Sequence, residues 1–263
     1  MKMQPKKGVS IDSESYEEYI EKFKEKRTKD DTFTPPEVYE AVKDWVVKEY
    51  SLEGREIIRP FWPDADFTQT DYPKGCVVID NPPFSIQTKI CDWYLEHGID
   101  FFLFANHVTL FRTLRLPKVN AVVTGNSVTF QNGAKLPISY LTNMGTDRVL
   151  VSGDLYDIVR KATGVTENTH NLIEFPANII SAPRLTKMAR LGMNHRIKNM
   201  TYWPTIESYN IFGGGGLISD SEVAKLEVAK LEVANAEPKV TYQLSDRELD
   251  EIKRLNEKDK IND

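Results

Sequence analysis

The sequence Asp80-Asn81-Pro82-Pro83-Phe84 follows the apolar run Cys76-Val77-Val78-Ile79, and together these residues decide the fold. A run of β-branched residues between Gly75 and Pro82 predicts a buried strand. The two prolines prevent both a longer strand ladder and a helix, so the chain leaves the sheet in a stiff, extended turn. That turn offers an amide side chain, two main-chain carbonyl groups and an aromatic face. Such a set can hold a planar ring that carries an exocyclic amine.

The segments around this turn predict an α/β fold. A helix is expected over about residues 85–97, ending at Gly98, and a buried strand over Ile99–Ala105. An earlier strand is expected at Glu56-Ile57-Ile58. Strand, helix and strand in this order favour a parallel sheet with right-handed crossovers.

A hairpin is expected farther along the chain. Ala121–Thr124 predicts a short strand, and Asn132-Gly133 separates two further apolar runs, Val128–Phe130 and Pro137–Leu141. Asn-Gly between such runs favours a tight turn. We therefore expect a mostly parallel sheet with a terminal antiparallel hairpin.

The chain divides into three parts by its sequence pattern. Residues 1–30 predict an amphipathic helix, and residues 31–212 the α/β domain, with further helices at 153–163 and from Pro183 to Leu191. Residues 217–263 carry 12 acidic and 8 basic side chains and predict a charged helical tail. Its last helix begins with a capping box formed by Ser245 and Glu248.

Composition indicates a soluble protein. Of the 263 residues, 40% are hydrophobic and 28% are charged. No apolar run approaches the roughly 18 residues of a membrane helix, and we expect no membrane association. The two cysteines predict no disulfide framework, and a cytoplasmic location is expected. The four histidines lack metal spacing, so no metal site is predicted; His107 is expected to solvate a loop.

Charge is distributed unevenly along the chain. The net charge is −5, yet residues 175–206 contain no carboxylate. This basic segment, 184–203, is a candidate contact for DNA or RNA phosphates through Arg184, Lys187, Arg190, Arg196 and Lys198. Arg112, Arg115 and Lys118 form a second, smaller cluster. An ordinary solvated helix face explains the basic segment equally well.

Asn81-Pro82-Pro83-Phe84 resembles the signature of the amino-methyltransferases that use S-adenosylmethionine, Asp/Asn/Ser-Pro-Pro-Tyr/Phe after a strand. The resemblance implies that the Asn81 side chain and the Pro82 carbonyl accept hydrogen bonds from the target amine, while Phe84 stacks on the base. It also implies that an adenine leaves the DNA duplex to reach the turn. A Pro-Pro turn with no chemical role is the plainer alternative.

Neighbouring segments extend the resemblance to compact phage-type DNA adenine-N6 methyltransferases over about residues 31–142. Thr34 is expected to cap a helix that begins at Pro35, and in that family the corresponding segment lines the cofactor pocket. The resemblance accordingly places in that pocket Phe33, Thr34, Pro35, Pro60, Phe61, Asp64, Asp66 and Asp80. The glycine-rich cofactor turn of many such enzymes is absent from residues 59–64, so the Rossmann-like methyltransferase sheet is expected to be abbreviated between its first strand and the catalytic strand.

These features lead to three functional hypotheses. The first is methyl transfer from S-adenosylmethionine to adenine N6 in duplex DNA. The second is a non-catalytic DNA-binding protein that retains a degenerate methyltransferase fold. The third keeps the chemistry and changes the acceptor to RNA or a protein amide.

Overall fold

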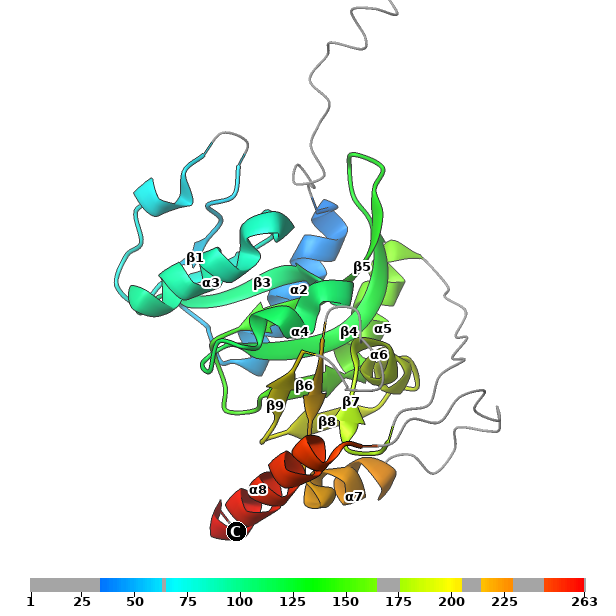
Figure 1. The fold of residues 1–263 in the computed structure, drawn as a ribbon. Helices are drawn as coiled ribbons and strands as arrows, with labels where there is room; N and C mark the ends of the chain where they lie inside the picture. Colours follow the sequence, from blue (N-terminus) through cyan, green and yellow to red (C-terminus); the bar gives the residue numbers. More distant parts are fainter. Residues whose placement is uncertain (1–33, 63–64, 165–175, 205–213, 229–243, 263) are drawn as a thin grey trace, which may run out of the picture.

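A computed structural model describes residues 34–62, 65–164, 176–204, 214–228 and 244–262. The expected helix in residues 1–30, and the candidate residues Phe33 and Asp64, lie outside the described residues. The described part is an α/β fold with a seven-stranded mixed sheet in the order β1-β2-β3-β5-β4-β6-β8 and a three-stranded antiparallel sheet in the order β7-β10-β9 (Figure 1).

The first half of the large sheet is parallel, as expected. It contains β1 (Ile57–Ile58), β2 (Val77–Asp80) and β3 (Asp100–Asn106), which pair side by side in the same direction. The short helix η1 (Phe67–Gln69) lies between β1 and β2. Between β2 and β3 the chain forms η2 (Phe84–Ile86) and α3 (Gln87–Glu96), and η3 (His107–Thr109) and α4 (Leu110–Thr113) follow β3. Helix α3 confirms the helix expected over residues 85–97.

The second half of the sheet is built on the hairpin. β4 (Asn120–Thr129) and β5 (Lys135–Thr142) pair antiparallel around Asn132-Gly133, as predicted. The expected short strand at 121–124 is the first half of the long strand β4. The hairpin is not terminal, because β5 pairs with β3, and β4 pairs in parallel with β6 (Val149–Ser152). β8 (Asn194–Ile197) closes this edge antiparallel to β6, so the sheet is mixed rather than mostly parallel.

Helices cover both faces of the large sheet (Figure 1). Alternate residues of β3 point to opposite faces, as the two-residue period of a strand requires. Phe102 and Phe104 pack with α2 (Pro36–Glu49) and α5 (Gly153–Thr163), whereas Phe101, Leu103 and Ala105 pack with α3, α4 and α6 (Ala182–Arg190). The expected cap of α2 is wrong by one residue, because Pro35 is the cap and makes no side-chain bond there.

The small sheet connects the C-terminal helices to the rest of the domain. It consists of β7 (Ile179–Ile180), β9 (Thr201–Trp203) and β10 (Gly215–Leu217), followed by α7 (Asp220–Val228) and α8 (Asp246–Asn262). Leu255 of α8 packs against Ile179 and Leu217, and the Trp203 indole N–H donates to Glu248 Oε1 over 3.1 Å. The Glu248 carboxylate also accepts the Ser245 main-chain N–H at 2.8 Å, which is the return bond of the predicted capping box.

A bulge in β4 sets the distance between the hairpin and α6. Gly125 lies between the paired residues Val122 and Asn126 and has φ +70°, and a Cβ atom there would lie 2.2 Å from Thr186 Oγ1. Gly125→Ala is expected to lower the free energy of unfolding by about 3 kcal/mol, from left-handed strain and overpacking together. Gly133→Ala is the matched control, since Gly133 has φ +81° with no atom within 4 Å of a Cβ. Urea unfolding of both variants measures the difference, and equal losses would contradict the close approach to α6.

Candidate functional site

The Asn81 turn lies at the edge of the sheet where β1, β2 and β3 end. Pro82 is buried, and Asn81 and Phe84 are half-buried. The Phe84 ring meets Phe130 of the hairpin edge to face, with 6.5 Å between ring centroids. The Gln87 side-chain amide donates to the Phe104 carbonyl over 2.6 Å and fixes the start of α3 on β3. The turn is therefore fixed to the hairpin through Phe84 and to β3 through Gln87.

Asp80 is the buried acid of this edge. Its Oδ2 atom accepts the main-chain N–H of Phe61 at 3.0 Å, and its Oδ1 atom lies 3.4 Å from Arg59 Nε. Burial raises the pKa of the Asp80 carboxyl group, while hydrogen bonds from the Phe61 and Asn81 amides and from Arg59 oppose that rise. These bonds join the end of β1 to the end of β2.

Tyr39 connects the start of α2 to the same cluster. Its hydroxyl group donates to the Ile79 carbonyl over 3.1 Å, and the Arg59 guanidinium lies over its ring, 3.7 Å from the centroid. Burial raises the pKa of Tyr39 to about 12. The Thr34 hydroxyl oxygen, near the start of this helix, is buried and has no hydrogen-bond partner among the described residues.

The structure thus brings together several segments that the sequence singled out. The start of α2, the Pro60–Phe61 segment and Asp80 meet at one edge. Asp66 does not join them, because it is exposed and its carboxylate accepts the Thr68 N–H at 2.9 Å and the Thr68 hydroxyl at 2.7 Å. These two bonds lower its pKa and stabilise its own turn.

Sequence reasoning missed Arg59 and Tyr39. Arg59 directly follows a predicted strand, but nothing in the sequence shows that it stacks on a tyrosine from the preceding helix. It also missed three exposed apolar side chains, one from each segment that follows β1, β2 and β3: Trp62, Ile86 in η2 and Val108 in η3. Large exposed apolar groups cannot be distinguished from core residues by pattern, because both are simply hydrophobic in sequence.

The predicted nucleic-acid contacts divide between internal bonds and exposed positions. Arg184 donates to the carbonyls of Ala177 and Ile179, and Arg196 forms ion pairs with Glu49 and Asp147. Both therefore serve the fold. Lys187 and Arg190 are half-buried on α6. Arg112, Arg115 and Lys198 are exposed, and so is Arg196 despite its ion pairs.

Strand directions separate these basic residues further. Arg190 is the last residue of α6 and lies just before β8 begins. It is therefore at the same end of the sheet as the Asn81 turn, where β1, β2 and β3 end. Lys198 follows the end of β8, which runs antiparallel to β6, and so lies at the opposite edge. The basic segment therefore does not form one continuous face at the turn.

His107 lies directly after β3, in a buried row of hydrogen-bonded polar side chains. It is 6% exposed, so the expectation that it solvates a loop is wrong. Ser139 Oγ accepts the amides of Thr124 and Gly125 and lies 2.8 Å from His107 Nδ1, so its proton is directed to that nitrogen. His107 Nε2 then donates to Thr186 Oγ1 over 2.7 Å. Burial lowers the pKa of His107 to about 4, and the nearby charge of Arg190 acts in the same direction.

No helix in the described ranges is long and apolar enough to cross a membrane. No group of three or more His, Cys, Asp or Glu side chains in those ranges is arranged to hold a metal ion. Comparison of the chain with protein-family models, with curated proteins and with solved structures finds no match.

Proposed function

We propose that this protein transfers a methyl group from S-adenosylmethionine to the exocyclic N6 amine of an adenine that is turned out of duplex DNA. The observation that carries the proposal is the Asn81-Pro82-Pro83-Phe84 turn, fixed where β2 ends and next to the Tyr39, Arg59 and Asp80 cluster. In open α/β sheets, ligands bind outside the carboxyl ends of the strands. The Rossmann-like methyltransferase resemblance supplies the identity of the reaction.

The residues at the turn suit an aromatic amine. Such an amine is a poor nucleophile, because its lone pair is delocalised into the ring. Hydrogen bonds from its N–H groups to the Asn81 side-chain oxygen and the Pro82 carbonyl favour the pyramidal geometry that frees the lone pair. The Phe84 ring, which packs edge to face with Phe130, suits stacking on the base. Catalysis then rests on positioning, with no covalent enzyme intermediate.

The surrounding residues also suit the methyl donor. The buried Thr34 hydroxyl oxygen offers an unused polar contact, and the half-buried Phe61 offers aromatic surface next to the Asp80 carboxylate. When bound, S-adenosylmethionine supplies the electrophilic methyl group on its sulfonium sulfur. The exposed Trp62, Ile86 and Val108 suit contact with bases around the one that is turned out, since apolar side chains stack on or wedge between bases.

A methyl-transfer assay on unmodified duplex DNA with labelled donor tests the proposal. Asn81→Ala is expected to lower the rate about a hundredfold, because a side-chain oxygen that positions the amine is lost. Asn81→Asp keeps an acceptor oxygen and is expected to retain more activity than Asn81→Ala. Asn256→Ala, on helix α8 and outside the turn and its contacts, is the matched control and should leave the rate unchanged. Equal rates for wild type and Asn81→Ala would exclude the catalytic role.

One observation favours a second function, a non-catalytic nucleic-acid-binding protein. The Asp80 carboxylate is already bonded to Phe61 and faces Arg59, so it is not open to a cofactor in this arrangement. Calorimetry with S-adenosylmethionine separates the two functions. Absence of binding at millimolar cofactor would favour the non-catalytic protein. Binding of the cofactor without methylation of DNA would indicate that the methyl acceptor is RNA or a protein amide.

A further inference from the structure

A second candidate site lies at the end of the large sheet where β2, β3 and β4 begin, opposite the Asn81 turn. A cavity of about 640 Å³ opens there. Its lining includes the start of β3 (Asp100), the start of β4 (Asn120), the residue after β5 (Asn143) and the residue before β6 (Arg148). Because β5 runs antiparallel to β3 and β4, all four positions fall at the edge where β2 begins rather than where it ends. The cavity is therefore separate from the candidate methyltransferase site.

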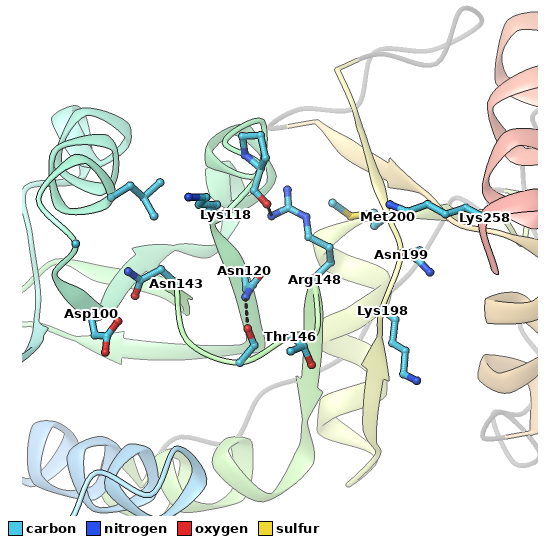
Figure 2. Close-up of a pocket in the computed structure, with 14 residues that line it drawn as sticks. Asp100, Lys118, Asn120, Asn143, Thr146, Arg148, Lys198, Asn199, Met200 and Lys258 are labelled. Carbon is cyan, nitrogen blue, oxygen red and sulfur yellow. Dashed lines mark hydrogen bonds between the residues drawn. The ribbon is translucent and has the colours of Figure 1, made fainter. Parts of the chain in front are cut away.

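The lining of this cavity is strongly basic. It includes four cationic side chains, Lys118, Arg148, Lys198 and Lys258, but only one carboxylate, that of Asp100. Asp100 is already neutralised, since its Oδ2 atom lies 2.7 Å from Arg55 Nη2. The view in Figure 2 shows Arg148 between Lys118 on one side and Met200 and Lys258 on the other. A cavity of this charge is unexpected in a chain whose net charge is −5.

Arg148 is the one half-buried cation of this set, since the three lysines are exposed. Its guanidinium donates to four main-chain carbonyls of the segment between α4 and β4: Leu114, Leu116, Pro117 and Val119. Among the described residues it forms no ion pair. Burial lowers the pKa of Arg148, which is the effect of removing a charge from water without an anion beside it. An anion in the cavity would supply that missing charge.

We propose that this cavity binds a nucleotide-sized anion through its phosphate groups. The lysines come from three separate segments, so they suit a ligand with several negative charges rather than a single carboxylate. Leu95, Pro117 and Met200 add apolar surface for the organic part of the ligand. A volume of about 640 Å³ falls within the range that accommodates small organic ligands and cofactors. The site goes beyond the proposed methyl transfer and does not depend on it.

Calorimetry of the full chain with ATP at low salt tests the site. ATP is expected to bind, and adenosine, which lacks phosphate, is not. The double variant Lys118→Gln/Lys198→Gln is expected to weaken ATP binding about tenfold or more, because two charge-assisted contacts are lost. Both lysines are exposed, so the variant should fold normally. The matched control is Lys89→Gln/Lys253→Gln, which removes two exposed lysines that do not line the cavity.

Three results would overturn the assignment. Absence of ATP binding at millimolar concentration would exclude the site, and equal binding by wild type and the Lys118→Gln/Lys198→Gln variant would place ATP elsewhere. Binding of a single-stranded oligonucleotide through the same two lysines, without binding of ATP, would show that the site takes a nucleic-acid strand. Because none of these measurements involves Asn81 or methyl transfer, failure here leaves the proposed activity intact.

Discussion

Replacing Arg148 with glutamine is expected to lower the free energy of unfolding by about 3 kcal/mol, because four main-chain carbonyl groups, three of them in part-buried bonds, lose their donors. The guanidinium bonds four carbonyls between Leu114 and Val119, with distances of 3.3 Å to Leu116 and 3.1 Å to Pro117. No glutamine side chain has enough N–H groups to replace them. Urea unfolding monitored by circular dichroism measures the loss.

Arg115→Gln is the matched control for this substitution. Arg115 lies in the same segment and is exposed, so its replacement is expected to change stability by less than about 0.5 kcal/mol. Arg148→Lys separates charge from geometry, since lysine keeps the charge and loses the planar fork of donors. A stability of Arg148→Gln equal to that of Arg115→Gln would show that the four carbonyl bonds contribute nothing.

Acid is expected to destabilise the protein through His107. The pKa of this residue is about 4 in the folded chain, below its ordinary value of 6.5. The stability it contributes is therefore fully present above pH 6.5 and is lost as the pH falls towards 4, because the unfolded chain takes up a proton that the folded chain excludes. The loss amounts to about 3 kcal/mol at its limit.

The wild type and His107→Gln must be compared across this pH range, because carboxylates elsewhere also respond to acid. Glutamine keeps polar atoms near Ser139 and Thr186 but cannot titrate. The difference in unfolding free energy between the two proteins is expected to shrink as the pH falls from 6.5 to 4. His97→Gln serves as the control, since His97 is exposed at the C-cap of α3. A difference that stays constant with pH would rule out burial of a neutral His107.

The sequence predicted those parts of the fold that local pattern decides. The β-branched run at 77–79, Gly98 after α3, and Asn132-Gly133 in the hairpin each determine their own neighbourhood, and each lies where it was expected. β8 was not predicted, because Asn194–Ile197 is a polar edge strand with only Ile197 buried. The position of the hairpin also depends on pairing between distant segments, and no local signal reports that β5 pairs with β3.

At the candidate site, too, local features could be predicted from the sequence and contacts between distant segments could not. The Asn81 turn could be located from sequence, since strand and prolines are contiguous there. The contacts around it could not be predicted, because they join residues far apart: Tyr39 and Ile79 are 40 positions apart, and His107 and Thr186 are 79 apart. The basic segment was misleading as a single face for a related reason. Two of its arginines bond within the fold, and strand reversal carries Lys198 to the opposite edge.

The central position of the hairpin has a consequence for folding. β5 joins the two halves of the large sheet, since it pairs with β3 on one side and with β4 on the other. The pairing of β4 with β5 is the most local in the sheet, because only residues 130–134 separate the two strands. A hairpin of this kind forms within microseconds and requires little loop closure. The sheet can therefore grow in both directions from a hairpin that forms early. Cutting the chain within residues 130–134 would place β4 and β5 on separate fragments, and their pairing would then require two chains to associate.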